Sequence, residues 1–196
     1  MANFFNAEAA IIERLKHELS PKLTYHSYFH TLDVLNAAMI IASTENITRE
    51  ELSLLRVAVA YHDSGFIEAY KDHELKSCEY ARMELPDHGF TADQIELICG
   101  IIMATKIPQN PTTLLQQIIA DADLDYLGRP EYQHIAAKLY DELTKQSLIQ
   151  DEKKWMALQE SFIKSHKYFT NFSKTNREQV KLQHLQKIID QGSSAS

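Results

Sequence analysis

The sequence predicts an all-α fold, and three observations favour this class. Apolar residues recur at helical spacing, for example in three- and four-residue steps within residues 11–19. Capping-box patterns precede three apolar runs, because Thr48, Thr91 and Thr113 are each followed three residues later by Glu or Gln. Alternation of apolar and polar residues, the pattern of a half-buried strand, never extends beyond a few residues. These patterns predict a helical bundle of about eight or nine helices.

Proline and glycine separate the expected helices. Ser20-Pro21 stops the first one, which ends near residue 19. The run after Thr48 is apolar on nearly all sides, as expected for a central buried helix, and Gly65 is expected to end it in the left-handed conformation. Two further helices begin after the other capping threonines. The remaining helices are expected at about 28–43, 72–85, 130–148, 151–169 and 174–189.

Length and composition predict a single globular domain. The 196 residues are enough for one sizeable core, and we assign residues 1–190 to the domain and 191–196 to a disordered tail. The net charge of -7 and the lack of a long basic run argue against binding to nucleic acid. No window approaches 18 consecutive apolar residues, so no membrane span is expected.

The cysteines indicate a reducing compartment. Cys78 and Cys99 do not form a CxxC pair, so neither a thiolate zinc site nor a disulfide framework is indicated. The amino-terminal segment reads as an amphipathic helix and not as a signal peptide. We therefore expect a cytoplasmic protein.

Three short segments combine histidine and aspartate with apolar surroundings. In YHSYFH, His26 and His30 stand four residues apart, a spacing that would place both imidazoles on one face of a helix. In AYHD, His62 and Asp63 end a very apolar run, and in DADLDYLG, Asp123 follows another. Each feature alone is more often a helix cap, a satisfied core residue or a solvated turn.

Taken together, the segments predict a metal site. A buried carboxylate is costly unless it is paired or metal-bound, so Asp63 and Asp123 indicate one shared buried partner, most simply a divalent cation. A calcium loop is excluded because Tyr126 and Tyr132 occupy the positions that need Gly and Glu. Imidazole with carboxylate suits Zn, Mn, Fe, Ni or Co, and Mg less well. Without the cation, we expect neighbouring carboxylates to repel each other and the pKa of at least one to rise.

The order of these segments resembles the HD-domain superfamily of metal-dependent phosphohydrolases. The strings YHSYFH, AYHD and ADADLDYLG carry the resemblance, which extends from about residue 25 to 128. It implies an HD-type helical fold whose metal-site core lies in this range, with C-terminal helices over about 130–190. The later string FIKSHKYFT resembles small stand-alone members more weakly.

The resemblance also implies roles for individual residues. His30, His62, Asp63 and Asp123 match the metal ligands of the superfamily. His26 matches the histidine that protonates the leaving oxygen in the related cyclic-nucleotide phosphodiesterases. Asp63 is given a catalytic role as well, either as a bridge to a second metal or in orienting the nucleophile.

The chain departs from the wider superfamily pattern at the second metal site. His73 stands where many members carry a His-Glu pair, but Thr105 and Lys106 occupy the place of the next usual histidine. Glu68 is available where some members have a catalytic glutamate, although its spacing matches poorly. We interpret His73, Lys106 and Arg129 as candidate substrate contacts, with a solvated surface role as the alternative for the two cations.

The function implied is hydrolysis of a phosphate ester of a small metabolite, most simply a nucleotide, by a metal-activated water. Both phosphomonoesterase and phosphodiesterase activity fit this expectation. The cation would be Mn, Fe, Ni, Co, Zn or Mg. Two alternatives remain, a di-iron HD-type oxygenase and a non-catalytic domain that binds a metal or nucleotide for regulation. The expected partner is the small phosphorylated substrate, and a homo-oligomer is a further alternative.

Overall fold

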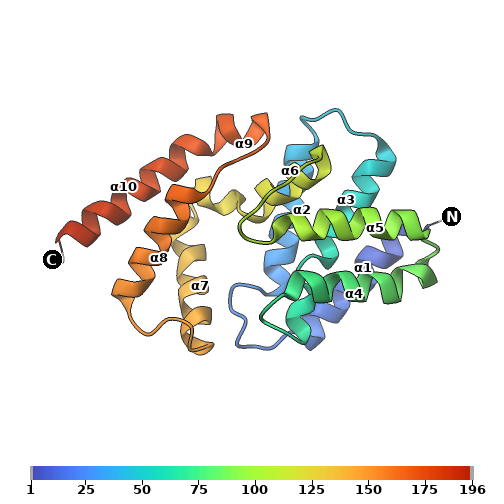
Figure 1. The fold of residues 1–196 in the computed structure, drawn as a ribbon, viewed down its shortest axis with the longest axis horizontal. Helices are drawn as coiled ribbons and strands as arrows, with labels where there is room; N and C mark the ends of the chain where they lie inside the picture. Colours follow the sequence, from blue (N-terminus) through green and yellow to red (C-terminus); the bar gives the residue numbers. More distant parts are fainter. Residues whose placement is uncertain (1, 195–196) are drawn as a thin grey trace.

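The computed structural model describes residues 2–194, and within them the protein is helical with no β-strand (Figure 1). This confirms the all-α prediction. The helices are α1 Phe4–Glu18, α2 Tyr28–Ala42, α3 Arg49–Tyr61, α4 His73–Glu84, α5 Ala92–Ile102, α6 Leu114–Asp123, α7 Tyr132–Lys145, α8 Glu152–Ser165, α9 Asn171–Asn176 and α10 Glu178–Ser194. Short 3-10 helices are η1 Ser64–Ile67, η2 Leu85–His88, η3 Met103–Thr105 and η4 Asp125–Gly128.

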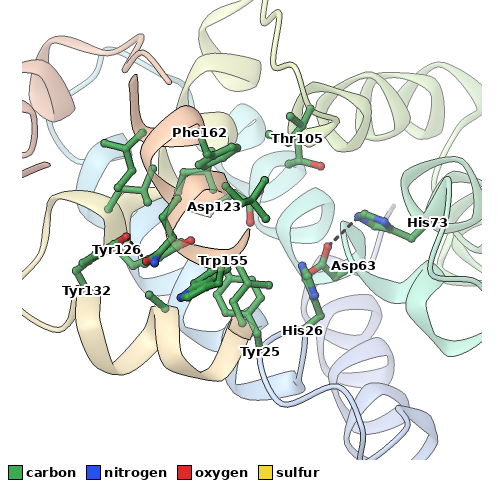
Figure 2. Close-up of a pocket in the computed structure, with 18 of the residues that line it drawn as sticks. Tyr25, His26, Asp63, His73, Thr105, Asp123, Tyr126, Tyr132, Trp155 and Phe162 are labelled. Atoms are coloured by element: carbon green, nitrogen blue, oxygen red, sulfur yellow. Dashed lines mark hydrogen bonds and ion pairs between the residues drawn. The ribbon is translucent and has the colours of Figure 1, made fainter. Parts of the chain in front are cut away.

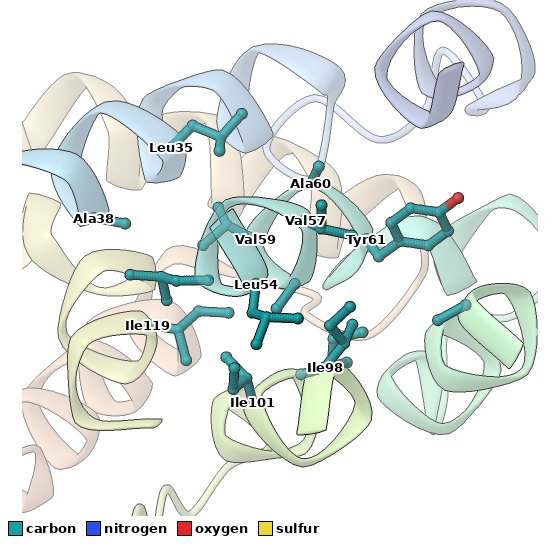
Figure 3. Close-up of a cluster of buried hydrophobic side chains, with 14 of the residues drawn as sticks. Leu35, Ala38, Leu54, Val57, Val59, Ala60, Tyr61, Ile98, Ile101 and Ile119 are labelled. Atoms are coloured by element: carbon teal, nitrogen blue, oxygen red, sulfur yellow. The ribbon is translucent and has the colours of Figure 1, made fainter. Parts of the chain in front are cut away.

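Helix α3 forms the centre of the larger core. It packs against α1, α2 and α5, and every residue from 57 to 61 is 0% exposed (Figure 3). Burial on all sides follows from its almost continuous apolar sequence. Because α3 is enclosed in this way, the His62-Asp63 pair at its end is delivered into the interior of the protein.

The capping boxes predicted from the sequence fix where three helices begin. The side chain of Thr48 accepts the backbone N–H of Glu51, whose carboxylate accepts the N–H of Thr48 in return. The same reciprocal arrangement begins α5 at Thr91 and α6 at Thr113. These caps set the register of α3, which leads directly into His62 and Asp63, and of α6, which ends at Asp123.

The carboxyl-terminal third differs from expectation at several boundaries. Helix α8 ends at Ser165 and not near 169, because the backbone is extended from His166 onward. One helix is expected over 174–189, but the structure has two. The short α9 ends at Asn176 and α10 begins at Glu178, with Arg177 between them. Helix α10 continues to Ser194, past residue 191 where the tail is expected to begin. Residues 195 and 196 of that tail lie outside the described residues.

Gly65 has a packing role and not the left-handed cap expected of it. Among the glycines of the described residues, Gly89 has a positive φ and Gly65 does not. A Cβ on Gly65 would lie only 2.0 Å from the carbonyl oxygen of His73. Glycine is therefore needed for the close approach of η1 to the start of α4, which brings His73 beside Asp63.

A second, smaller core joins the carboxyl-terminal helices to the rest of the protein. It contains Leu127, Tyr132, Trp155 and Ile163, from η4, α7 and α8. Figure 1 shows α7, α8 and α10 gathered at one end of the molecule, beside α2 and α6. Across residues 2–194, no helix has both the length and the apolar character needed to cross a bilayer.

Candidate metal centre and substrate cavity

The four predicted metal ligands come together from three helices. His30 lies on α2, His62 and Asp63 follow the last residue of α3, and Asp123 ends α6. Nε2 of His30 is 3.1 Å from Oδ1 of Asp123, and Nε2 of His62 is 3.5 Å from the same oxygen. The donor atoms of these three residues all lie within 4.8 Å of one another, as a shared metal ion requires.

Asp63 faces the same point from the side of α3. Its Oδ2 is 3.3 Å from Nε2 of His62 and 3.6 Å from Nε2 of His30. His30, His62 and Asp63 are 9%, 0% and 5% exposed. The proximity agrees with the ligand set implied by the resemblance, and metal ligation by these residues stays a prediction.

The environment of His62 fits a metal ligand. Its Nδ1 lies 2.7 Å from the carbonyl oxygen of Val59, so this nitrogen carries the proton and Nε2 is turned toward the carboxylates. Nε2 of His62 and Oδ2 of Asp63 are buried and make no hydrogen bond. Unsatisfied buried polar atoms are rare in native structures. A cation between them would satisfy both.

The electrostatics of the centre contradict one expectation. Burial alone would raise the pKa of both aspartates, but the nearby histidines outweigh it. They hold the pKa of Asp63 far below its usual value, and His30 and His62 lower that of Asp123 to about 2. Burial opposes protonation of His62, yet the charge of Asp63 raises the pKa of this imidazole. The expected rise of a carboxylate pKa by mutual repulsion is therefore wrong, because the contacts with the neighbouring imidazoles outweigh burial and repulsion.

His26 reaches the centre by a different route from the one the sequence indicates. Helix α2 begins only at Tyr28, so His26 and His30 do not share a helix face. Their ring centroids are nevertheless 5.9 Å apart. The ring of Phe66 stacks on His26 at 4.2 Å and on His73 at 3.9 Å, between centroids. Phe66 thus holds both imidazoles at the edge of the metal centre.

Glu142 is a site residue that the sequence analysis missed. It lies on α7, is 0% exposed, and one carboxylate oxygen accepts the backbone N–H groups of Tyr25 and His26, each at 2.9 Å. The other oxygen is 2.5 Å from Nδ1 of His26 and accepts the hydroxyl of Tyr70 at 3.0 Å. The sequence offered one sign that Glu142 is buried. It stands three residues after Leu139, so both side chains lie on the apolar face of α7.

Glu142 orients His26 and favours its protonated form. Burial opposes protonation of His26, but the hydrogen bond to Glu142 outweighs it and raises the pKa of the imidazole. Burial would likewise raise the pKa of Glu142, and His26 lowers it instead. The pairing therefore favours the protonated imidazole, and it leaves the other nitrogen of His26, Nε2, outside the hydrogen bond with Glu142.

A cavity of about 220 Å³ opens beside the metal centre (Figure 2). His26, Asp63, His73 and Asp123 line one end of it, and residues from η4, α7 and α8 line the other. Nε2 of His73 is 3.5 Å from Oδ1 of Asp63, so this predicted substrate contact belongs to the cavity. The arrangement can hold a cation at one end and an organic group at the other.

The other candidate contacts lie outside this cavity. Lys106 is paired with Asp72 at 2.7 Å on the surface. Arg129 forms a two-pronged ion pair with Asp33 and lines a separate cavity behind His30. Glu68 is bound to Tyr80 and Lys76, away from the metal centre. Lys106, Arg129 and Glu68 are not among the described residues that line the metal-centre cavity, and their proposed roles stay predictions.

The aspartates that flank Asp123 have structural partners. Asp121 accepts the backbone N–H groups of Phe169 and Thr170 and the hydroxyl of Thr170. Asp125 is 2.7 Å from Nε of Arg177. The three aspartates therefore have different partners. Asp123 faces the metal centre, whereas Asp121 and Asp125 bind residues of the carboxyl-terminal segment.

Part of the chain matches a known protein family. The HD domain model matches residues 28–125, half of the chain, and this range includes all four clustered residues. The chain belongs to the HD domain family. A solved structure of a predicted HD superfamily hydrolase from an uncultured Thermotogales bacterium has the same fold, with a TM-score of 0.56 at 22% identity. The match covers 73% of this HD domain protein and 85% of that chain. No curated protein matches the chain of this HD domain protein.

Family membership confirms the resemblance stated from the sequence. Together with the clustered His and Asp side chains, it indicates a metal-dependent hydrolase. The matched range ends at residue 125, so Glu142 and the part of the cavity formed by α7 and α8 lie outside it.

Proposed function

We propose that this HD domain protein hydrolyses the phosphate ester of a small metabolite. The observation that carries the proposal is the pair of buried atoms that make no hydrogen bond, Nε2 of His62 and Oδ2 of Asp63, beside a cavity of metabolite size. His30, His62, Asp63 and Asp123 would hold a divalent cation there. When bound, the cation supplies a water of lowered pKa and neutralises charge on the phosphoryl oxygens.

Under this proposal, His26 donates a proton to the leaving oxygen. A general acid must be held protonated and pointed at its target, and the ion pair with Glu142 supports both requirements. Asp63 is proposed to orient the attacking water or to contact a second metal together with His73. The neighbouring Glu74, which is 3.6 Å from Nε2 of His73, adds a further oxygen at this position.

A nucleotide is the substrate that we propose first. The cavity walls include Trp155 and Phe162, on which a base could stack, and either a monoester or a diester would place its phosphate at the metal centre. Mn, Fe, Ni, Co and Zn match the mixed nitrogen and oxygen donors better than Mg does. The buried free thiols of Cys78 and Cys99 support a cytoplasmic setting. Neither nucleic acid nor a membrane is proposed as a partner, and a homo-oligomer is compatible with the proposal.

The test is phosphate release by the metal-free protein after addition of Mn, Mg, Ni, Co, Zn or Fe, with a panel of nucleotides and other phosphate esters. We expect release that depends on the cation and is abolished in Asp123→Asn. A protein that binds the cation but releases no phosphate from any ester would contradict the proposal in favour of a regulatory domain. Turnover that requires both iron and O₂ would favour the oxygenase.

A further inference from the structure

The far end of the cavity differs sharply from the metal end. In Figure 2, His26, Asp63 and His73 lie on one side, whereas Tyr126 and Tyr132 lie on the other. The wall at this far end is mainly aromatic and aliphatic, and comes from η4, α7 and α8. Its members are Leu124, Tyr126, Leu127, Tyr132, Ala136, Leu139, Trp155, Leu158, Phe162 and Ile163. Such a surface suits a flat apolar group.

The charge of the cavity limits how many phosphates it can take. Among the described residues that line it, none is a lysine or an arginine, whereas Asp63, Glu74 and Asp123 contribute carboxylates. One phosphoryl group can be neutralised at the metal centre. Beyond the metal centre and His26, a second or third phosphoryl group would meet no lysine or arginine, and burying an unpaired charge is unfavourable.

One polar group stands out in the apolar wall. The hydroxyl of Tyr132, which is 4% exposed, donates to Oε1 of Gln159 at 2.7 Å. Gln159 lines the cavity, and this hydrogen bond fixes the orientation of its amide. Nε2 of Gln159 then remains as a donor for an acceptor atom on the ligand. A fixed donor at this half-buried position favours a ligand with an acceptor, because a ligand without one displaces water from the donor and leaves it unpaired.

We propose that the cavity selects phosphate monoesters whose organic group is planar, aromatic and equipped with a hydrogen-bond acceptor, and that it rejects diphosphates and triphosphates. This rests on the proposed function, because it assumes that the phosphate lies at the metal centre. A cavity of about 220 Å³ is smaller than the ~300–1,000 Å³ typical of sites for drug-sized ligands, which favours one small ring system. A nucleoside monophosphate has all of these properties. Gln159 and Tyr132 are the specificity-determining pair.

The kinetic test compares four substrates under the same cation: uridine 5′-monophosphate, uridine 5′-triphosphate, 1-naphthyl phosphate and glycerol phosphate. We expect kcat/KM to be highest for the uridine monophosphate and at least about 10-fold lower for the triphosphate and for glycerol phosphate. Gln159→Leu should lower kcat/KM for uridine monophosphate by about 10-fold or more, while 1-naphthyl phosphate, which has no ring acceptor, is unaffected. Gln133→Leu, an exposed position on α7, serves as the matched control.

A binding test separates this inference from the proposed function. Trp155 is the only tryptophan of the chain and lines the cavity, so its fluorescence reports occupancy directly. We expect uridine monophosphate to change the fluorescence of the Zn-loaded His26→Ala variant saturably, and inorganic phosphate and the triphosphate to leave it unchanged. If no ester is hydrolysed but this response occurs, the proposed function fails and the inference stands. Equal fluorescence responses to the monophosphate and the triphosphate would overturn the inference. So would an equal fall in kcat/KM for uridine monophosphate and 1-naphthyl phosphate in Gln159→Leu.

Discussion

Asp63 has a different electrostatic role from the one its sequence context indicates. Without metal, its carboxylate is compensated by the imidazoles of His62 and His30, which lie within 3.6 Å. Its pKa is depressed, so the stabilisation is present above the ordinary pKa of an aspartate and is lost as pH falls toward the depressed value. Removing one member of a buried ion pair typically costs about 3–5 kcal/mol.

We therefore expect Asp63→Asn to be less stable than the wild type in the metal-free state, by up to about 3–5 kcal/mol at neutral pH. The variant should also lose most of the stabilisation that a divalent cation confers. Chemical unfolding with and without added Mn or Ni measures both effects. A variant that responds to the cation as the wild type does would show that Asp63 is not a ligand.

Glu142 offers a second test at single residues. Glu142→Gln removes the charge that keeps His26 protonated, so the pKa of His26 should fall. The basic limb of the kcat–pH profile should then move to lower pH, with metal content unchanged. His26→Ala should lower kcat by roughly 10²–10⁴-fold, again without loss of metal. Glu131→Gln, on an exposed residue just before α7, is the control. An unshifted profile in Glu142→Gln would assign that carboxylate a purely structural role.

At the scale of elements, the end of α6 joins the metal centre to the carboxyl-terminal segment. Asp121 and Asp123 are two residues apart, yet one binds the backbone at Phe169 and Thr170 and the other faces His30 and His62. Asp121→Asn and Asp123→Asn make the same chemical change at these two positions. Comparing them separates the stability of the fold from the binding of metal.

We expect Asp121→Asn to lower the free energy of unfolding by roughly 1.5–3 kcal/mol, because it weakens charge-assisted hydrogen bonds in a buried setting. Its metal content should equal that of the wild type. Asp123→Asn should have the opposite effect, so that its metal content falls more than its free energy of unfolding. Denaturant unfolding and elemental analysis of both variants provide the measurement. Loss of metal from a fully folded Asp121→Asn protein would contradict this division of roles.

At the scale of the whole molecule, the sequence predicted the helices better than their ends. Capping threonines and the apolar run of α3 are local signals, and the helices they predict are present. The segment after α8 is bound by Asp121, and Arg177 at the break before α10 pairs with Asp125. Both aspartates are distant in sequence from these segments, and local patterns cannot report such contacts. The direction of the carboxylate pKa shifts was missed for a related reason, because it depends on which side chains meet in three dimensions.

The metal centre was accessible from the sequence because its four residues carry a recognisable order. Glu142 was not, since a single glutamate on an amphipathic helix is usually solvated, and only the packing of α7 against the segment at Tyr25 and His26 buries it. The same holds for Gln159 and the aromatic wall, whose residues read as ordinary core packing. The family pattern thus predicts the cluster of His30, His62, Asp63 and Asp123, and only the fold reveals the apolar end of the cavity beside it.

The central claim is that one divalent cation is held jointly by His30, His62, Asp63 and Asp123. Anomalous diffraction from crystals of the protein grown with Mn or Zn tests it most directly. We predict a strong peak between α2, α3 and α6, with at least one nitrogen or oxygen atom of each of the four side chains at about 2.0–2.3 Å. A well-ordered structure with full metal occupancy elsewhere, or with no peak among these four side chains, would contradict the account.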